Sequence, residues 1–135
     1  MFLLDTDALS EIEKPRPDGG LLGWFGHVDW LDLHISVITV GELWKGIAEL
    51  PAGRKRRALE AMFDLIPDRF HGRILPVDYA VAVKFGEIQA AHGPLPSLDS
   101  LIAATALTHH LTLVTHNTRD MARTGAAVLD PGPGT

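Results

Sequence analysis

The chain has 135 residues, 46% of them hydrophobic, which fits one domain with a core of its own. It contains no cysteine, which excludes disulfides, thiolate metal sites and a cysteine nucleophile. Its formal net charge of −5 has the wrong sign for a protein that binds nucleic acid through a general basic face. The N-terminal run MFLLD lacks a basic start and ends in an acid, so we expect no signal peptide. No apolar stretch approaches the ~18 residues of a membrane helix, and we expect a soluble, cytoplasmic protein.

The hydrophobic pattern predicts strands that alternate with helices. We expect strands at residues 2–4, 34–38, 74–77, 111–115 and 127–129. We expect helices at residues 6–14, 21–31, 40–50, 54–66, 78–92 and 98–109, the first of them stopped by Pro15 and Pro17. The Pro- and Gly-rich residues 130–135 are expected to form a flexible tail, so the domain spans 1–129. This order predicts a single α/β domain with a central parallel β-sheet flanked by α-helices.

Four acidic residues stand where an apolar run gives way to a helix or a loop: Asp5, Glu42, Asp99 and Asp120. In parallel sheets, ligands bind beyond the carboxyl ends of the strands, so these side chains are expected to converge there. Converging carboxylates repel each other unless a divalent cation neutralises them, and an all-oxygen donor set suits Mg²⁺ or Mn²⁺. Asp5 also has the apolar neighbours Leu3, Leu4 and Leu9, among which a carboxylate is costly unless it is paired or metal-bound.

Each of these acids also has a purely structural interpretation. Asp5 would cap the helix that follows it. Glu42 would complete a capping box with Thr39, because Thr39-Val-Gly-Glu42 matches S/T-x-x-E. Asp99 would lie in the first turn of a helix capped by Ser97, where a negative charge is favoured. The fourth acid would be an ordinary turn residue. Both interpretations place the acids at helix starts beside strand ends, so the sequence leaves both open.

Three blocks of the chain resemble the PIN-domain family, in particular its VapC- and FitB-type toxins: LLDTDALSE, ISVITVGELWKGI and LDSLIAATALTHHLTLVTHNTRDM. The resemblance runs from about Phe2 to Leu129. It implies a small α/β fold with a central parallel sheet and Mg²⁺- or Mn²⁺-dependent endoribonuclease activity. It also implies a cognate antitoxin that inhibits the activity, and a homodimer.

The resemblance assigns roles to individual residues. It implies three catalytic and metal-binding acids, Asp5, Glu42 and Asp99. Asp120 is favoured as a fourth metal ligand because it carries a charge, with Asn117 as the alternative. Asp7 departs from the family, which more often has Asn there, and Thr6 would place a hydroxyl near the metal. One bound ion, or two, would activate a water for in-line attack on a phosphodiester.

Basic side chains are expected to bind a single-stranded RNA substrate: Arg54, Lys55, Arg56, Arg57 and Arg119. The consecutive run 54–57 is alternatively a solvated helix start. Trp24, Trp30 and Trp44 are expected in the core or an interface rather than in base stacking. Trp44 shares the helix of Glu42 and would alternatively line a groove for the antitoxin.

Two rival functions are weighed against this hypothesis. Asp5-Thr6-Asp7 resembles the D-x-D motif of haloacid-dehalogenase-type phosphatases, but the chain shows no convincing counterpart of their lysine. A PIN-like module without activity would only bind a partner, and retention of the three core acids argues against it.

Overall fold

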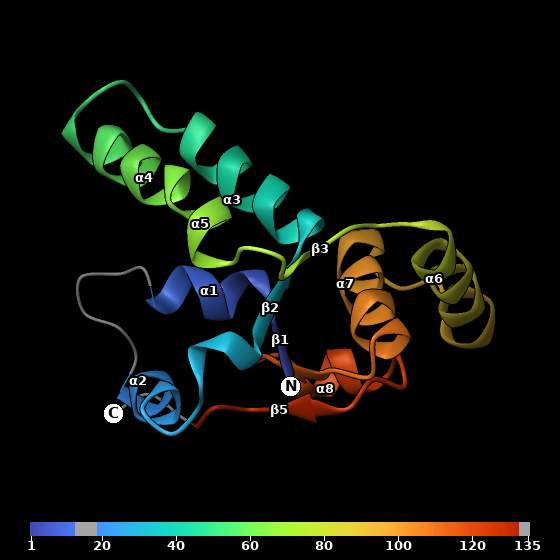
Figure 1. The fold of residues 1–135 in the computed structure, drawn as a ribbon. Coiled ribbons are helices and arrows are strands. Elements are labelled where there is room, and N and C mark those ends of the chain that lie inside the picture. The colour runs from blue at the N-terminus through green and yellow to red at the C-terminus, as the bar shows by residue number, and fades with distance from the viewer. Residues whose placement is uncertain (13–18, 133–135) are drawn as a thin grey trace.

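A five-stranded parallel sheet forms the centre of the protein (Figure 1). The computed structural model describes residues 1–12 and 19–132. In sheet order, the strands are β3 (Ile74–Leu75), β2 (Leu33–Ser36), β1 (Phe2–Leu4), β4 (Thr112–Val114) and β5 (Val128–Leu129). The chain builds the sheet from β1 toward one edge and then crosses to place β4 on the other side of β1. Ligands bind beyond the strand ends at such a switch point, here between β1 and β4. The predicted α/β class is confirmed.

Helices pack on both faces of this sheet. They are α1 (Thr6–Ile12), α2 (Gly19–Phe25), α3 (Val37–Ala48), α4 (Arg54–Asp64), α5 (Ile66–Arg69), α6 (Tyr79–His92), α7 (Ser97–Thr108) and α8 (Thr118–Ala122), with a 3-10 turn at Trp30–Asp32. α3 and α4 form a hairpin that projects from the sheet, whereas α6 packs along α7 on the other side of the molecule (Figure 1).

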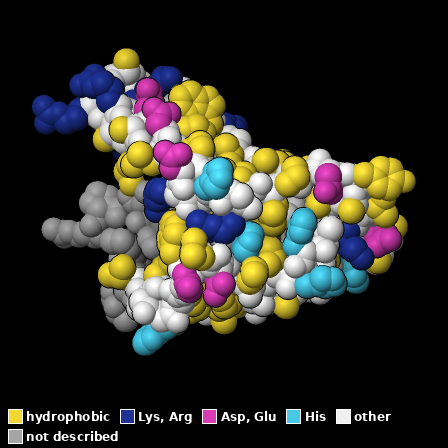
Figure 2. Space-filling model, in the orientation of Figure 1, with side chains coloured by type: hydrophobic (Ala, Val, Ile, Leu, Met, Phe, Trp, Pro, Cys, Tyr) yellow, Lys and Arg dark blue, Asp and Glu magenta, His cyan; other side chains and the backbone are white. Residues whose placement is uncertain are grey.

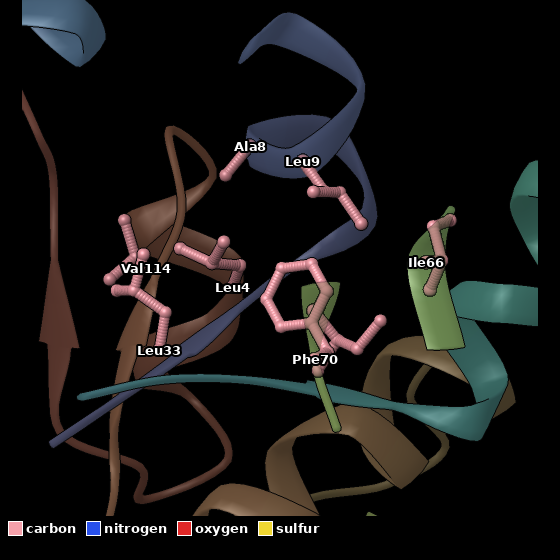
Figure 3. Packing of buried hydrophobic residues seen from close by; sticks show 8 residues of the cluster. Leu4, Ala8, Leu9, Leu33, Ile66, Phe70 and Val114 are labelled. Carbon is pink, nitrogen blue, oxygen red and sulfur yellow. The ribbon is translucent and has the colours of Figure 1, made fainter. Parts of the chain in front are cut away.

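Successive residues of β1 point to opposite faces of the sheet and enter two different cores. Leu4 packs with Leu9 of α1 and with Phe70, which follows α5 (Figure 3). Leu3 packs with Ile102 of α7. Both leucines of β1 are fully buried, and full burial of one such side chain contributes about 1.5–3 kcal/mol. The two cores therefore fix the end of β1 between α1 and α7.

An aromatic row extends the first core, as expected for two of the tryptophans. Trp24 packs edge-on against Phe2 with 5.1 Å between ring centroids, and Trp30 lies 5.0 Å from Phe70. The indole nitrogen Nε1 of Trp30 donates to the carbonyl of Arg69 at 3.0 Å. Trp24 and Trp30 are thus partly buried residues that pack against the core.

Two predicted elements begin or end at residues other than those expected, because polar side chains start helices where the hydrophobic pattern gives no signal. The predicted strand 34–38 ends at Ser36, whose Oγ accepts a hydrogen bond from Ile38 N (3.0 Å) and starts α3 ahead of the predicted residue 40. The predicted helix 21–31 is interrupted. α2 ends at Phe25, and Asp29 starts the 3-10 turn by accepting from Leu31 N (2.9 Å).

The remaining limits follow the predictions more closely. The helix predicted at 54–66 ends at Asp64, and α5 follows as a separate short helix with Pro67 in its first turn. The other strands and helices are confirmed with limits shifted by one or two residues. Residues 13 and 14 of the first predicted helix, with the prolines that stop it, lie outside the described residues. The domain limit at 129 and the tail 130–135 stay predictions, and residues 133–135 lie outside the described range. Across residues 1–12 and 19–132, no helix has the length and apolarity to cross a bilayer.

Candidate active site

Asp5 follows β1 at the switch point of the sheet and is only 4% exposed. Its Oδ1 accepts a hydrogen bond from Ala8 N (2.7 Å), so the side chain caps α1. The hydroxyl of Thr115, which follows β4, also bonds this carboxylate. Burial raises the pKa of Asp5 above its usual value more than these two hydrogen bonds lower it, and the charges of Asp7 and Asp99 raise it further. The capping interpretation is correct, and it leaves room for a metal because a carboxylate offers about four lone-pair sites.

Asp99 lies half-buried in the first turn of α7. Burial is the largest cause that raises its pKa, followed by the charges of Glu42, Asp7 and Asp120. Like charges shift a pKa in this way when they lie near one another. The four predicted acids and Asp7 are therefore near enough for the charge of each to act on Asp5 or Asp99. The predicted cap by Ser97 is wrong, because Ser97 is the first residue of α7 and no side chain caps that helix.

Glu42 lies within α3, which packs beside α1. Its Oε1 accepts a hydrogen bond from Thr6 Oγ1 at 2.6 Å, and the same Thr6 Oγ1 lies 3.2 Å from Thr39 Oγ1. The predicted capping box of Thr39 and Glu42 is wrong, because Ser36 caps α3 and Thr39 is buried inside the helix. Glu42 is free of a role at the helix end and reaches across to the start of α1.

A cavity of about 130 Å³ between α7 and α8 contains Asp99, Asp120 and Arg123 in its lining. Asp120 belongs to α8 and is not a turn residue. Its charge raises the pKa of Asp99. Asn117 precedes α8, and its backbone N donates to Thr115 Oγ1 at 2.9 Å. Asp120, and not Asn117, lines this cavity with Asp99.

Arg123 is a candidate site residue that the sequence analysis missed. It is exposed, it follows α8, and it lines the cavity beside two carboxylates. Prediction of a short helix at 118–122 would have indicated Arg123 as a site residue. Residues three apart on a helix share a face, and Arg123 stands three positions after Asp120. No helix was predicted there, so this spacing carried no signal.

The predicted RNA-binding run 54–57 is not beside the acids. α4 begins at the end of the hairpin that projects from the sheet, and Lys and Arg side chains gather over that end (Figure 2). Arg56 is engaged within the hairpin, where its Nε lies 2.8 Å from Glu60 Oε1 and its Nη1 donates to the Leu50 carbonyl. Arg119 is exposed on α8, next to Asp120. Of the five predicted basic residues, only Arg119 is adjacent in sequence to one of the acids.

An apolar groove of about 250 Å³ begins at Glu42 and runs between α3 and α4. It is lined by Thr6, Ser10, Glu42, Leu43, Gly46, Ile47, Leu59, Met62, Phe63 and Ile66. Trp44 of α3 is 42% exposed and packs on Phe63 with 5.1 Å between ring centroids. Apolar side chains of the helix predicted at 54–66 thus line a groove whose one end contains Thr6 and Glu42.

The donor set fits a hard divalent cation. Its members are carboxylates, joined by the Thr6 and Thr115 hydroxyls, and oxygen ligands are those that Mg²⁺ and Mn²⁺ prefer. The raised pKa values of Asp5 and Asp99 show that the site is unfavourable for uncompensated negative charge. In the part of the chain that the structure describes, no three Asp, Glu or His side chains already stand in the arrangement of a metal site.

Comparison with known proteins identifies the fold family. The PIN domain model matches residues 2–127. Over 136 residues the chain is 38% identical to Toxin FitB of Neisseria gonorrhoeae, with 97% of this chain and 98% of that protein covered. The chain belongs to the PIN-domain family. It is also 31% identical over 137 residues to VapC ribonuclease Y4jK of Sinorhizobium fredii, with 97% of each covered. The crystal structure of FitAcB from Neisseria gonorrhoeae matches with a TM-score of 0.88 at 37% identity, covering 97% of this chain and 98% of that one.

This PIN domain matches its relatives along almost its whole length, which bears on the rival interpretations. The resemblance expected from the three sequence blocks is confirmed, and the relatives carry toxin and ribonuclease names. Family membership favours the nuclease interpretation of the first acidic block over the D-x-D phosphatase.

Proposed function

We propose that this protein is a divalent-metal-dependent endoribonuclease and the toxin of a toxin–antitoxin pair. The single observation that carries the proposal is the set of carboxylates at the β1–β4 switch point, where Asp5 and Asp99 have raised pKa values. The names of the FitB and VapC relatives give the reaction class and the biological context.

Asp5, Glu42 and Asp99 would hold a Mg²⁺ or Mn²⁺ ion, with Asp120 as a further oxygen ligand. When bound, the ion supplies Lewis-acid stabilisation of charge on the phosphodiester and lowers the pKa of a coordinated water. Asp5 is fixed for this task, because its bond with Ala8 N and its burial leave the side chain little freedom. A preorganised carboxylate does not have to be ordered when the ion binds.

Glu42 is placed to act on the attacking water. Its Oε1 is held by Thr6, so the carboxylate has a fixed orientation beside the start of α1. We assign to Glu42 the orientation of the water and acceptance of its proton. The new bond would join the water oxygen to phosphorus while the opposite P–O ester bond breaks, and the leaving oxygen would take up a proton from solvent to give the hydroxyl end of the RNA.

Substrate binding is assigned to Arg123 and Arg119 near the acids and to the basic end of the α3–α4 hairpin farther away. Arg123 lines the cavity of Asp99 and Asp120, where a guanidinium would contact the phosphate that the acids themselves repel. The basic hairpin end would attract the flanking RNA by long-range electrostatics. With RNA contacts assigned to these two places only, this acidic protein would bind RNA along the surface that joins them and not over its whole face.

The antitoxin is proposed to bind in the apolar groove between α3 and α4. Its lining is mostly apolar, it is open along the surface, and Trp44 flanks it through Phe63. A segment with apolar side chains seated there would reach Thr6 and Glu42, and it would block the site directly. The homodimer remains a prediction, which light scattering of the purified protein tests.

The proposal is tested by exposing a total RNA pool to the purified protein with Mg²⁺, Mn²⁺ or a chelator. Cut ends are mapped by sequencing, and Asp5→Asn serves as the control for contaminating ribonuclease. Discrete cuts that require metal and disappear in the variant are expected. Folded wild-type protein that gives no metal-dependent cuts, after removal of any bound antitoxin, would instead identify an inactive binding module.

A further inference from the structure

Three side chains link the start of α1, which Asp5 caps, to α3, which carries Glu42. Thr6 is the first residue of α1, directly after Asp5, while Thr39 and Glu42 lie one turn apart on α3. Thr6 Oγ1 is 2.6 Å from Glu42 Oε1 and 3.2 Å from Thr39 Oγ1. Thr39 is fully buried. Among the described residues, its hydroxyl has Thr6 as its hydrogen-bond partner.

The number of protons fixes the direction of these two hydrogen bonds. A hydroxyl has one proton to donate, and an ionised carboxylate can only accept. The short 2.6 Å contact therefore uses the Thr6 proton toward Glu42. Thr6 Oγ1 must then accept in its second contact, so Thr39 donates to Thr6. The result is an ordered relay from Thr39 through Thr6 to Glu42.

We propose that Thr39 is a positioning residue that acts through Thr6 on Glu42. This inference rests on the proposed function and concerns how the same site is assembled. Thr39 orients the Thr6 hydroxyl, Thr6 holds Oε1 of Glu42, and the other oxygen of Glu42 stays available for the metal and the water. Thr39 itself contacts neither.

The relay also sets the distance between acids on separate elements. Asp5 caps α1 and Glu42 lies on α3, so a bond from the first residue of α1 to Glu42 fixes one carboxylate relative to the other. Misplacement of a catalytic group by about 1 Å can cost on the order of 100-fold in rate. A structural role in packing alone would not produce this effect, because valine fills the space of threonine.

The test compares Thr39→Val with Thr39→Ser, since the first removes the hydroxyl at nearly constant volume and the second keeps it. The matched control is Thr105→Val, because Thr105 is also fully buried in a helix, where it donates to the Leu101 carbonyl away from the relay. Three quantities are measured for each protein: Mn²⁺ affinity by calorimetry, kcat and KM on an RNA that the wild type cleaves, and the thermal midpoint. Glu42→Gln and its combination with Thr39→Val complete a double-mutant cycle for Mn²⁺ affinity.

We expect Thr39→Val to lower kcat by roughly 10- to 100-fold and to weaken Mn²⁺ binding, with KM for RNA little changed. Thr39→Ser should retain most of the wild-type kcat and Mn²⁺ affinity, and Thr105→Val should change neither kcat nor Mn²⁺ affinity. In the Glu42→Gln background, Thr39→Val should have no further effect on Mn²⁺ affinity. Equal behaviour of Thr39→Val and Thr105→Val, or no rescue by serine, would overturn the relay while leaving the nuclease proposal intact. A wild type that neither cleaves RNA nor binds Mn²⁺ would overturn the proposed function itself, and the relay with it.

Discussion

Substitution of Asp5 separates its two roles, the helix cap and the charge. Asn keeps an oxygen that can accept from Ala8 N, and Asn and Asp are about equally good caps. Ala removes both the acceptor and the charge. Asp5→Asn compared with Asp5→Ala therefore measures the cap, and Asp5→Asn compared with the wild type measures the charge.

The expected sizes follow from the geometry. Loss of the cap typically costs about 1 kcal/mol, so Asp5→Ala should unfold roughly 3–5 °C below Asp5→Asn. The raised pKa of Asp5 means that its ionised form destabilises the metal-free fold at neutral pH. Asp5→Asn should consequently be at least as stable as the metal-free wild type. Thr115 can adapt, because its hydroxyl can accept from the new amide.

The assay is thermal unfolding at neutral pH, once with chelator and once with excess Mn²⁺, together with cleavage of RNA. A ligand at 100 times its dissociation constant stabilises the folded state by about 2.7 kcal/mol, and only the wild type should show this gain. Both variants should lose cleavage. If Asp5→Asn is as unstable as Asp5→Ala in chelator, the cap argument fails. If it keeps the Mn²⁺ gain and cleaves RNA, Asp5 is not a metal ligand.

Other substitutions test the remaining parts of the site. Burial and neighbouring charges raise the pKa of Asp99, so between the usual and the raised pKa the folded state holds a proton that the unfolded state has lost. The free energy of unfolding of the metal-free protein should therefore fall as pH rises through this window. Urea unfolding at several pH values should show a smaller fall for Asp99→Asn. Arg123→Gln should raise KM for RNA more than it lowers kcat, and a normal KM would exclude a phosphate contact. Met62→Glu should abolish the complex with a co-expressed antitoxin but not RNA cleavage, whereas Leu65→Glu, at an exposed position outside the groove, should leave the complex intact. Neutralising three exposed basic residues of the hairpin should reduce the slope of log K against log salt by about 2, and an unchanged slope would show that RNA does not reach Arg54, Lys55 and Arg57.

Local patterns were sufficient where a local rule decides the structure. Alternation of strands and helices identified the class of the fold, and the rule for parallel sheets placed the acids at one edge. The prediction for Asp5 as a cap was correct because capping depends on the backbone of the next few residues. These features need no knowledge of distant segments.

Tertiary contacts decided the start of α3. Both Ser36 and Thr39 can cap a helix, and the S/T-x-x-E pattern favours Thr39. β2 ends where Ser36 pairs with Leu75 of β3, so the helix begins immediately afterwards and Thr39 becomes a buried interior residue. A partner strand far along the chain thus converted the expected cap into a buried residue whose hydroxyl bonds that of Thr6.

The sequence by itself determined which carboxylates are present and that each follows an apolar run. Only the tertiary structure decided which basic residues accompany them, because α4 starts at the far end of a hairpin while Arg123 lies in the same cavity as Asp99. Periodicity reports whether a side chain faces the core, and it contains no information on which helices meet. The carboxylates converge through strand order, but their partners are selected by the packing of α1 on α3 and of α7 on α8.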